Sequence, residues 1–259
     1  MSSGSGLNLQ SIEQRLSLAA LLAVAAIAWA FLIASEAAMD TMRGDGIVME
    51  MMWAMMSPSA TGPYLASAAA MWVVMMIAMM VPAVLPMTSV YRGIYRGTSA
   101  QLDTLLFASG YFLGWSAFSL LAAALQWWLH LSGILHGHRL DTGAHVAAGL
   151  LVVAGIYQLT PFKEACLARC RSPLGYFLAH WREGHAGAIK MGLRHGLFCI
   201  GCCWMLMLLM FAGGAMSVAT MAALSVFILL ERVVPNGPWA SRLPGVAMIV
   251  AGAVLTIRA

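Results

Sequence analysis

Charged residues are scarce in this sequence. Only 9% of its 259 residues are Asp, Glu, Lys or Arg, while 61% are hydrophobic, and a soluble domain typically has about 25% charged residues. A chain with so few charges cannot cover a water-facing surface, whereas a lipid bilayer is a solvent that tolerates it. The sequence therefore predicts an all-α, polytopic membrane helix bundle, with the lipid bilayer as its first partner.

Several functional signatures are also missing. There is no phosphate-binding GxxxxGK[ST] pattern, which argues against an ATP-driven pump. No acidic residue lies in the middle of an expected span, although a proton-coupled transporter would usually need one. No basic run carries interleaved aromatic residues, so the net charge of +4 does not indicate a nucleic-acid partner. A binding protein is therefore favoured over a pump or an enzyme.

Uncharged runs long enough to cross a bilayer recur along the chain. A crossing helix needs about 20 residues, and the run 196–230 is long enough for two short spans, with a turn at Gly213 and Gly214. We expect six to seven transmembrane helices in a single transmembrane domain, residues 15–259, after a flexible N-terminal tail, residues 1–14. The other expected spans are 16–38, 64–87, 104–131, 146–162 and 243–257.

The basic residues between the expected spans predict the orientation. With the N-terminus in the cytoplasm, 11 of the 14 Lys and Arg fall in cytoplasmic segments, as the positive-inside rule requires. The outer segments hold only Arg43, Arg139 and Arg258. The cytoplasmic residues are Arg15, Arg92, Arg96, Lys163, Arg169, Arg171, Arg182, Lys190, Arg194, Arg232 and Arg242.

Methionine is abundant and follows a repeated pattern. Of the 21 Met, eight lie in two copies of one motif: residues 51–58 read MMWAMMSP, and residues 75–82 read MMIAMMVP. Positions i and i+4 share a helix face, so each copy should present two rows of thioethers and should end at its proline. Such faces either pack adaptable helix interfaces or bind Cu(I), which favours thioethers. The candidate ligands are Met51, Met52, Met55 and Met56 in a Met-rich outer segment, residues 39–58, and Met75, Met76, Met79 and Met80 in the second span.

All five cysteines fall on the cytoplasmic side of this topology, in or beside a Cys/His-rich segment, residues 161–195. Thr160 as an N-cap and Pro161 as the first helical residue predict a short helix. Cys166 and Cys170 would share one face of that helix, because they are four residues apart. A second set of donors, at i, i+4, i+7 and i+8 on one side of the next span, comprises His195, Cys199, Cys202 and Cys203.

Three interpretations of these donors stay open. Thiol and imidazole groups suit a soft transition metal, with Cu(I) first and zinc as the second choice. The CxxCC residues Cys199 and Cys202 also suit a membrane thiol oxidoreductase. Alternatively, buried Cys can pack as a small hydrophobic residue in a structural membrane subunit. The odd number of cysteines and their cytoplasmic placement argue against a disulfide framework.

The cysteine segments PFKEACLARCRSP (161–173) and GLRHGLFCIGCCW (192–204), with the MMxAMMxP segment, resemble a bacterial domain-of-unknown-function family described as predicted metal-binding integral membrane proteins. The resemblance covers about residues 50–257 and implies a bacterial inner (cytoplasmic) membrane and a metal. Taken with the ligand types, it leads to a hypothesis of Cu(I) binding for movement, sequestration or cofactor assembly. Outer Met and His would capture the ion, inner Cys would receive it, and a membrane or periplasmic protein would be the partner.

Overall fold

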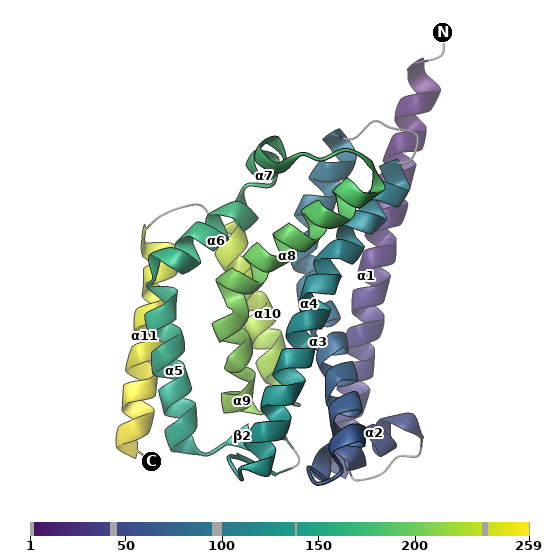
Figure 1. Ribbon diagram of the computed structural model, residues 1–259. Coiled ribbons are helices and arrows are strands. Elements are labelled where there is room, and N and C mark those ends of the chain that lie inside the picture. The colour runs from purple at the N-terminus through teal and green to yellow at the C-terminus, as the bar shows by residue number, and fades with distance from the viewer. Residues whose placement is uncertain (1–2, 42–45, 95–99, 138, 235–237, 259) are drawn as a thin grey trace.

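The computed structural model describes residues 3–41, 46–94, 100–137, 139–234 and 238–258, and nearly all of them are helical (Figure 1). The elements in chain order are α1 (Ser3–Thr41), α2 (Ile47–Met56), α3 (Thr61–Ile94), α4 (Ala100–Leu131), β1 (Leu135–His136), β2 (Asp141–Thr142), α5 (Ala144–Gln158), α6 (Pro161–Arg171), α7 (Pro173–His180), α8 (Gly184–Leu208), α9 (Met210–Gly213), α10 (Val218–Val233) and α11 (Pro238–Arg258). The two short strands pair antiparallel, with Leu135 opposite Thr142.

Four helical segments in the described residues are long and apolar enough to cross a membrane: Arg15–Met39, Thr61–Ile94, Ala100–Leu131 and Gly184–Gly213. A fifth is obtained if α5 and α6, which meet at an angle of 68°, count as one broken span. At 15 and 16 residues, α5 and α10 are shorter than a full crossing. The predicted all-α class is therefore confirmed, and the described residues include four helices of membrane length, while the number of six to seven spans stays a prediction.

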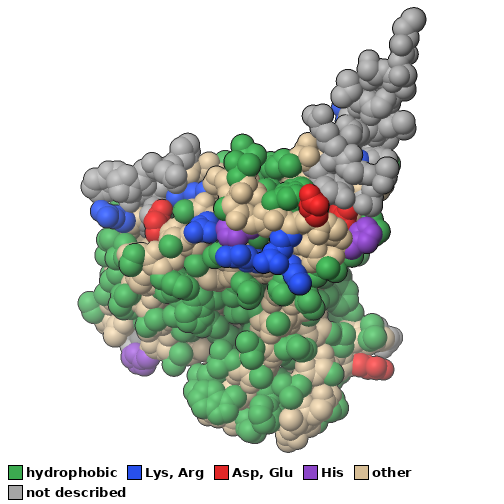
Figure 2. Space-filling model, turned by 45° about the horizontal axis from the view of Figure 1, so that its top comes forward, with side chains coloured by type: hydrophobic (Ala, Val, Ile, Leu, Met, Phe, Trp, Pro, Cys, Tyr) green, Lys and Arg blue, Asp and Glu red, His purple; other side chains and the backbone are tan. Residues whose placement is uncertain are grey.

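The long helices run between two ends of the molecule. One end carries α6, α7 and the beginning of α8, and the other carries α2, α9 and the β1–β2 turn (Figure 1). Side chains of Lys and Arg gather at the α6–α7 end (Figure 2), where Arg169, Arg182, Lys190 and Arg194 are exposed. This is the end that the sequence assigns to the cytoplasm.

Helices α4 and α8 form the closest helix pair around the centre of the molecule. A Cβ atom added at Gly192 would overlap the carbonyl of Phe107, and one added at Gly110 would overlap the carbonyl of Ile189. Glycine at these positions lets the two backbones touch, as small residues do between membrane helices. This approach fixes the side of α8 that carries the cysteines against Tyr111 of α4.

Helix α3 runs past the proline of the second methionine motif, as the expected span 64–87 requires. The helix continues through Pro82 and Pro86 to Ile94. Pro82 has no N–H, so the carbonyl of Ala78 loses its usual partner one turn away. The indole Nε1 of Trp29 on α1 donates to that carbonyl at 3.0 Å instead. A neighbouring helix thus satisfies the freed carbonyl, which is how membrane helices tolerate proline.

The first helix also starts earlier than expected. Residues 1–14 were predicted to form a flexible tail, yet α1 is helical from Ser3 onward. Residues 7–14 contain no proline or glycine, so a helix that is already formed in the span can propagate back through them. In the Met-rich outer segment, residues 42–45 lie outside the described residues.

Candidate metal centre

Two helices bring the five cysteines together. Helix α6 begins as predicted: Thr160 accepts a hydrogen bond from the backbone N–H of Lys163, and Pro161 is the first helical residue. Cys166 and Cys170 then lie on its buried face, against α8. A Cβ atom added at Gly201 of α8 would lie 2.8 Å from Sγ of Cys166, so the missing side chain makes room for this thiol.

The cysteines of α8 face those of α6. The side chains of Cys199, Cys202 and Cys203 are at most 2% exposed. The thiol of Cys170 lies near those of Cys199 and Cys202, and the thiol of Cys166 lies near that of Cys202. All five cysteines are free. We call this group the thiol cluster: Cys166, Cys170, Cys199, Cys202 and Cys203.

Two side chains that the sequence did not point to contact the thiol cluster. Nη2 of Arg232 on α10 lies 2.6 Å from Sγ of Cys199. The hydroxyl of Tyr111 on α4 lies 3.0 Å from the same sulfur. Arg232 was interpreted only as a topology marker. Its one distinguishing signal in the sequence is that Glu231 and Arg232 together end the apolar run of α10.

A buried ion pair holds α6 in place beside α10. Nζ of Lys163 lies 2.7 Å and 2.8 Å from the two carboxylate oxygens of Glu231. Gln158 donates to the same carboxylate at 3.1 Å, and Nε of Arg171 donates to the backbone carbonyl of Glu231 at 2.8 Å. Buried charges persist when they are paired and hydrogen-bonded. This network therefore sets the position of Cys166 and Cys170 relative to α10.

His195 sits on the α6–α7 side of Cys199 in an aromatic box. Its ring stacks on Tyr111, with centroids 5.5 Å apart, and meets Tyr176 of α7 edge-on at 5.3 Å. The residue is fully buried, yet neither ring nitrogen has a hydrogen-bond partner among the described residues. Buried polar atoms normally have hydrogen-bond partners. A buried imidazole whose two nitrogens have none is therefore more typical of a ligand site than of ordinary packing.

Helix α7 covers this end of the site. Tyr176 and Phe177 turn inward, while Leu174 and Leu178 are exposed. The hydroxyl of Tyr176 donates to the carbonyl of Met191 at 2.6 Å, and burial raises the pKa of Tyr176. The aromatic side chains of α7 therefore pack into the protein, and its leucines, which are hydrophobic, form the outer face.

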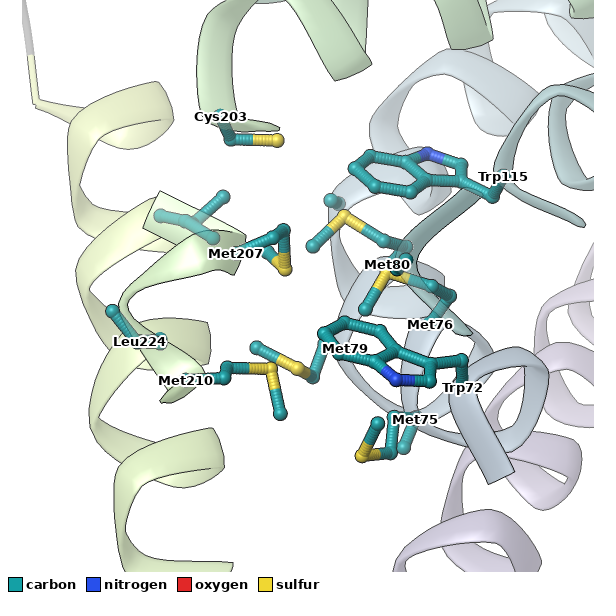
Figure 3. Close-up of a cluster of buried hydrophobic side chains, with 14 of the residues drawn as sticks. Trp72, Met75, Met76, Met79, Met80, Trp115, Cys203, Met207, Met210 and Leu224 are labelled. Carbon is teal, nitrogen blue, oxygen red and sulfur yellow. The ribbon is translucent and has the colours of Figure 1, made fainter. Parts of the chain in front are cut away.

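The thioethers of α3 form the other half of the site. Met75, Met76, Met79 and Met80 are all at most 2% exposed. Figure 3 shows them facing Met207 of α8 and Met210 of α9, with Cys203 at one end of the group and Met75 at the other. We call this group the Met column: Met75, Met76, Met79, Met80, Met207 and Met210. The sequence predicted its α3 members but not Met207 and Met210, which lie outside the repeated motif.

The first copy of the methionine motif is only partly buried. On α2, Met52 and Met55 belong to the hydrophobic core. Met51 is half-buried, and Met56 is 41% exposed. The expected pairs of methionines four residues apart are therefore not both buried. Instead α2 buries one pair three residues apart, Met52 and Met55, because the helix is short and presents only a narrow face to α3.

The thiols are close together but are not arranged around a metal. The Sγ atoms of Cys202 and Cys203 donate to the carbonyl of Cys199 at 3.1 Å and 2.9 Å. Among the residues that the structure describes, no group of three or more His, Cys, Asp or Glu side chains is arranged to hold a metal ion. The donor set itself fits a soft ion such as Cu(I), and turning a thiol away from a backbone carbonyl is enough to free its sulfur.

Most of the chain matches one protein family. Residues 69–255 match the PpoB2 family model, which is described as a copper chaperone. The chain belongs to the PpoB2 copper chaperone family. Comparison with curated proteins and with solved structures finds no match.

The PpoB2 match covers the α3 motif and the whole thiol cluster, but it leaves out α2 with Met51, Met52, Met55 and Met56. It agrees with the metal-related part of the resemblance drawn from the cysteine segments, and it supports copper over zinc. It does not favour the thiol oxidoreductase alternative. In this PpoB2 family member, the feature that best fits copper is the sulfur-rich interior formed by α3, α6 and α8.

Proposed function

We propose that the protein binds Cu(I) inside a bacterial inner membrane and hands it to a partner protein for cofactor assembly. In this proposal it is multi-pass, with six to seven spans and a cytoplasmic N-terminus, so that the basic α6–α7 end faces the cytoplasm. The thiol cluster and His195 hold the ion, and the Met column exchanges it with the opposite side. The partner is a membrane or periplasmic protein with sulfur ligands of its own.

One observation carries this proposal: the buried thioethers of the Met column lead to Cys203 of the thiol cluster (Figure 3). A chain of soft donors lets Cu(I) move by ligand exchange, because this ion accepts two or three sulfur ligands and does not need a rigid cage. Leucine would fill the same space equally well if only packing were required. The membership of a copper chaperone family supports delivery of copper to a partner.

X-ray absorption at the copper edge tests the proposal on detergent-purified protein loaded with one equivalent of Cu(I) under reducing conditions. We expect a first shell made of sulfur, with two or three scatterers. Competition with a chromogenic Cu(I) chelator should give binding that is much tighter than that of a His195, Cys199 and Cys202 triple variant. A first shell of oxygen and nitrogen, or equal binding by both proteins, would contradict the proposal.

A further inference from the structure

We propose that Arg232 is the fixed counter-charge of the metal-loaded thiol cluster and that it makes the site select a monovalent soft ion over a divalent one. This inference rests on the proposed function, because it assumes that the thiol cluster binds the metal. It assigns a specificity-determining role to a residue that is itself not a ligand.

The guanidinium of Arg232 is directed toward sulfur. Nη2 donates to Sγ of Cys199 at 2.6 Å and lies 4.0 Å from Sγ of Cys202. Nη1 donates to the carbonyl of Ala83 on α3 at 3.0 Å. The side chain is therefore held from two sides, by a carbonyl of α3 and by the thiols of α8.

The positive charge of Arg232 is not cancelled by the acid next to it in the sequence. The carboxylate of Glu231 is bound by Lys163 through both oxygens, so this pair is neutral without Arg232. The side chains that lie against its guanidinium are instead the thiols of Cys199 and Cys202. The thiol cluster thus contains one built-in positive charge.

That charge matters because the site is buried. Cu(I) bound by two thiolates is a complex of net charge −1, and with Arg232 the loaded site becomes neutral. A divalent ion on the same two thiolates is already neutral, and Arg232 would leave the site with a net positive charge. An uncompensated charge in an apolar interior is strongly unfavourable. Arg232 therefore favours Cu(I) and disfavours Zn(II) at the same set of sulfurs.

Charge replacement in the full-length protein separates this role from a structural one. We would measure the affinities for Cu(I) and for Zn(II), each against a competing chelator, in wild type, Arg232→Gln and Arg232→Lys. We expect Arg232→Gln to weaken Cu(I) binding by at least about tenfold and to leave Zn(II) binding unchanged or tighter, because only the Cu(I) complex loses its counter-ion. Arg232→Lys should restore the preference for Cu(I).

Arg194→Gln is the matched control. Arg194 is exposed, and its guanidinium lies over the ring of Phe198 at 5.9 Å. Like Arg232→Gln, this substitution removes one positive charge from the same end of the molecule. We expect it to change neither affinity.

The outcomes distinguish the inference from the proposed function. If wild type binds no Cu(I), the proposed function fails. If wild type binds Cu(I) and Arg232→Gln binds both metals as wild type does, or loses both equally, the inference fails alone. If Arg232→Gln does not fold, Arg232→Lys still decides: it should keep the wild-type preference for Cu(I) over Zn(II), and a loss of that preference would overturn the inference.

Discussion

Lys163 on α6 and Glu231 on α10 form an ion pair of 2.7 Å whose side chains are 1% and 5% exposed. The pair lies beside the thiol cluster and beside the arginine that contacts it: Lys163 is three residues before Cys166, and Glu231 is next to Arg232. Its geometry therefore connects the stability of this end of the bundle with the position of the candidate ligands.

Removing one partner of this ion pair should destabilise the protein more than removing both partners. Glu231→Leu leaves the Lys163 ammonium buried without a partner, which typically costs about 3–5 kcal/mol. Lys163→Met with Glu231→Leu removes both charges and should recover much of that loss. Thermal unfolding of detergent-purified protein gives the comparison. A double variant no more stable than the single one would show that the pair is not the controlling interaction.

The hydrogen bond from Trp29 to Ala78 should depend on Pro82. Trp29→Phe removes the donor and leaves the Ala78 carbonyl unsatisfied, which costs about 1–3 kcal/mol for a buried group. In a Pro82→Ala background the helix provides its own N–H to that carbonyl, so the same substitution should cost much less. Trp53→Phe, at a side chain that is 55% exposed, is the control. An equal loss of stability in both backgrounds would exclude this explanation of the proline-containing helix.

The Met column should matter for copper and not for folding. Met75→Leu with Met79→Leu conserves volume and should cost less than about 1.5 kcal/mol per site. We expect weaker Cu(I) retention and slower transfer to a chelator, measured by stopped-flow absorbance. Met56→Leu, at the exposed end of α2, should behave as wild type. If the double variant also exchanges Cu(I) at the wild-type rate, the Met column is a packing surface.

The orientation can be tested with reporters. A reporter that works only in the cytoplasm should be active when it is inserted between residues 180 and 184, beside the basic α6–α7 end. A reporter that works only outside the cytoplasm should be active when it is placed near His136 in the β1–β2 turn. The reverse pattern would put the thiols in an oxidising compartment and would undermine the copper site as well as the topology.

Local sequence rules predicted the parts of the site that depend on a single helix. Cys199, Cys202 and Cys203 share a side because 3.6 residues make a turn, and the start of α6 follows from the Thr160 cap. The rules failed where another helix intervenes. Nothing in the spacing shows that Trp29 would stabilise the turn at Pro82, or that Arg232 at a helix end would turn inward to sulfur.

The role of α7 and the extent of the Met column also depend on tertiary contacts. Tyr176 and Phe177 could equally have faced a membrane surface, and only the packing of α7 over His195 turns them inward. Met207 and Met210 belong to no repeated motif, so their sequence positions did not indicate that they would meet α3. The meeting of α6 with α8 depends less on distant parts of the chain, since a connection of only 28 residues separates Cys170 from Cys199.

Copper stoichiometry in thiol variants shows whether both cysteine segments form one copper site. Bound copper is measured by elemental analysis after Cu(I) loading and removal of weakly bound metal. If the thiol cluster is one site, Cys202→Ser should abolish most tight binding, and adding Cys166→Ser should then change little, because ligands that act as a unit give non-additive losses. If Cys199→Ser with Cys202→Ser leaves the copper content of the protein unchanged, the thiol cluster is a packing feature and does not bind copper.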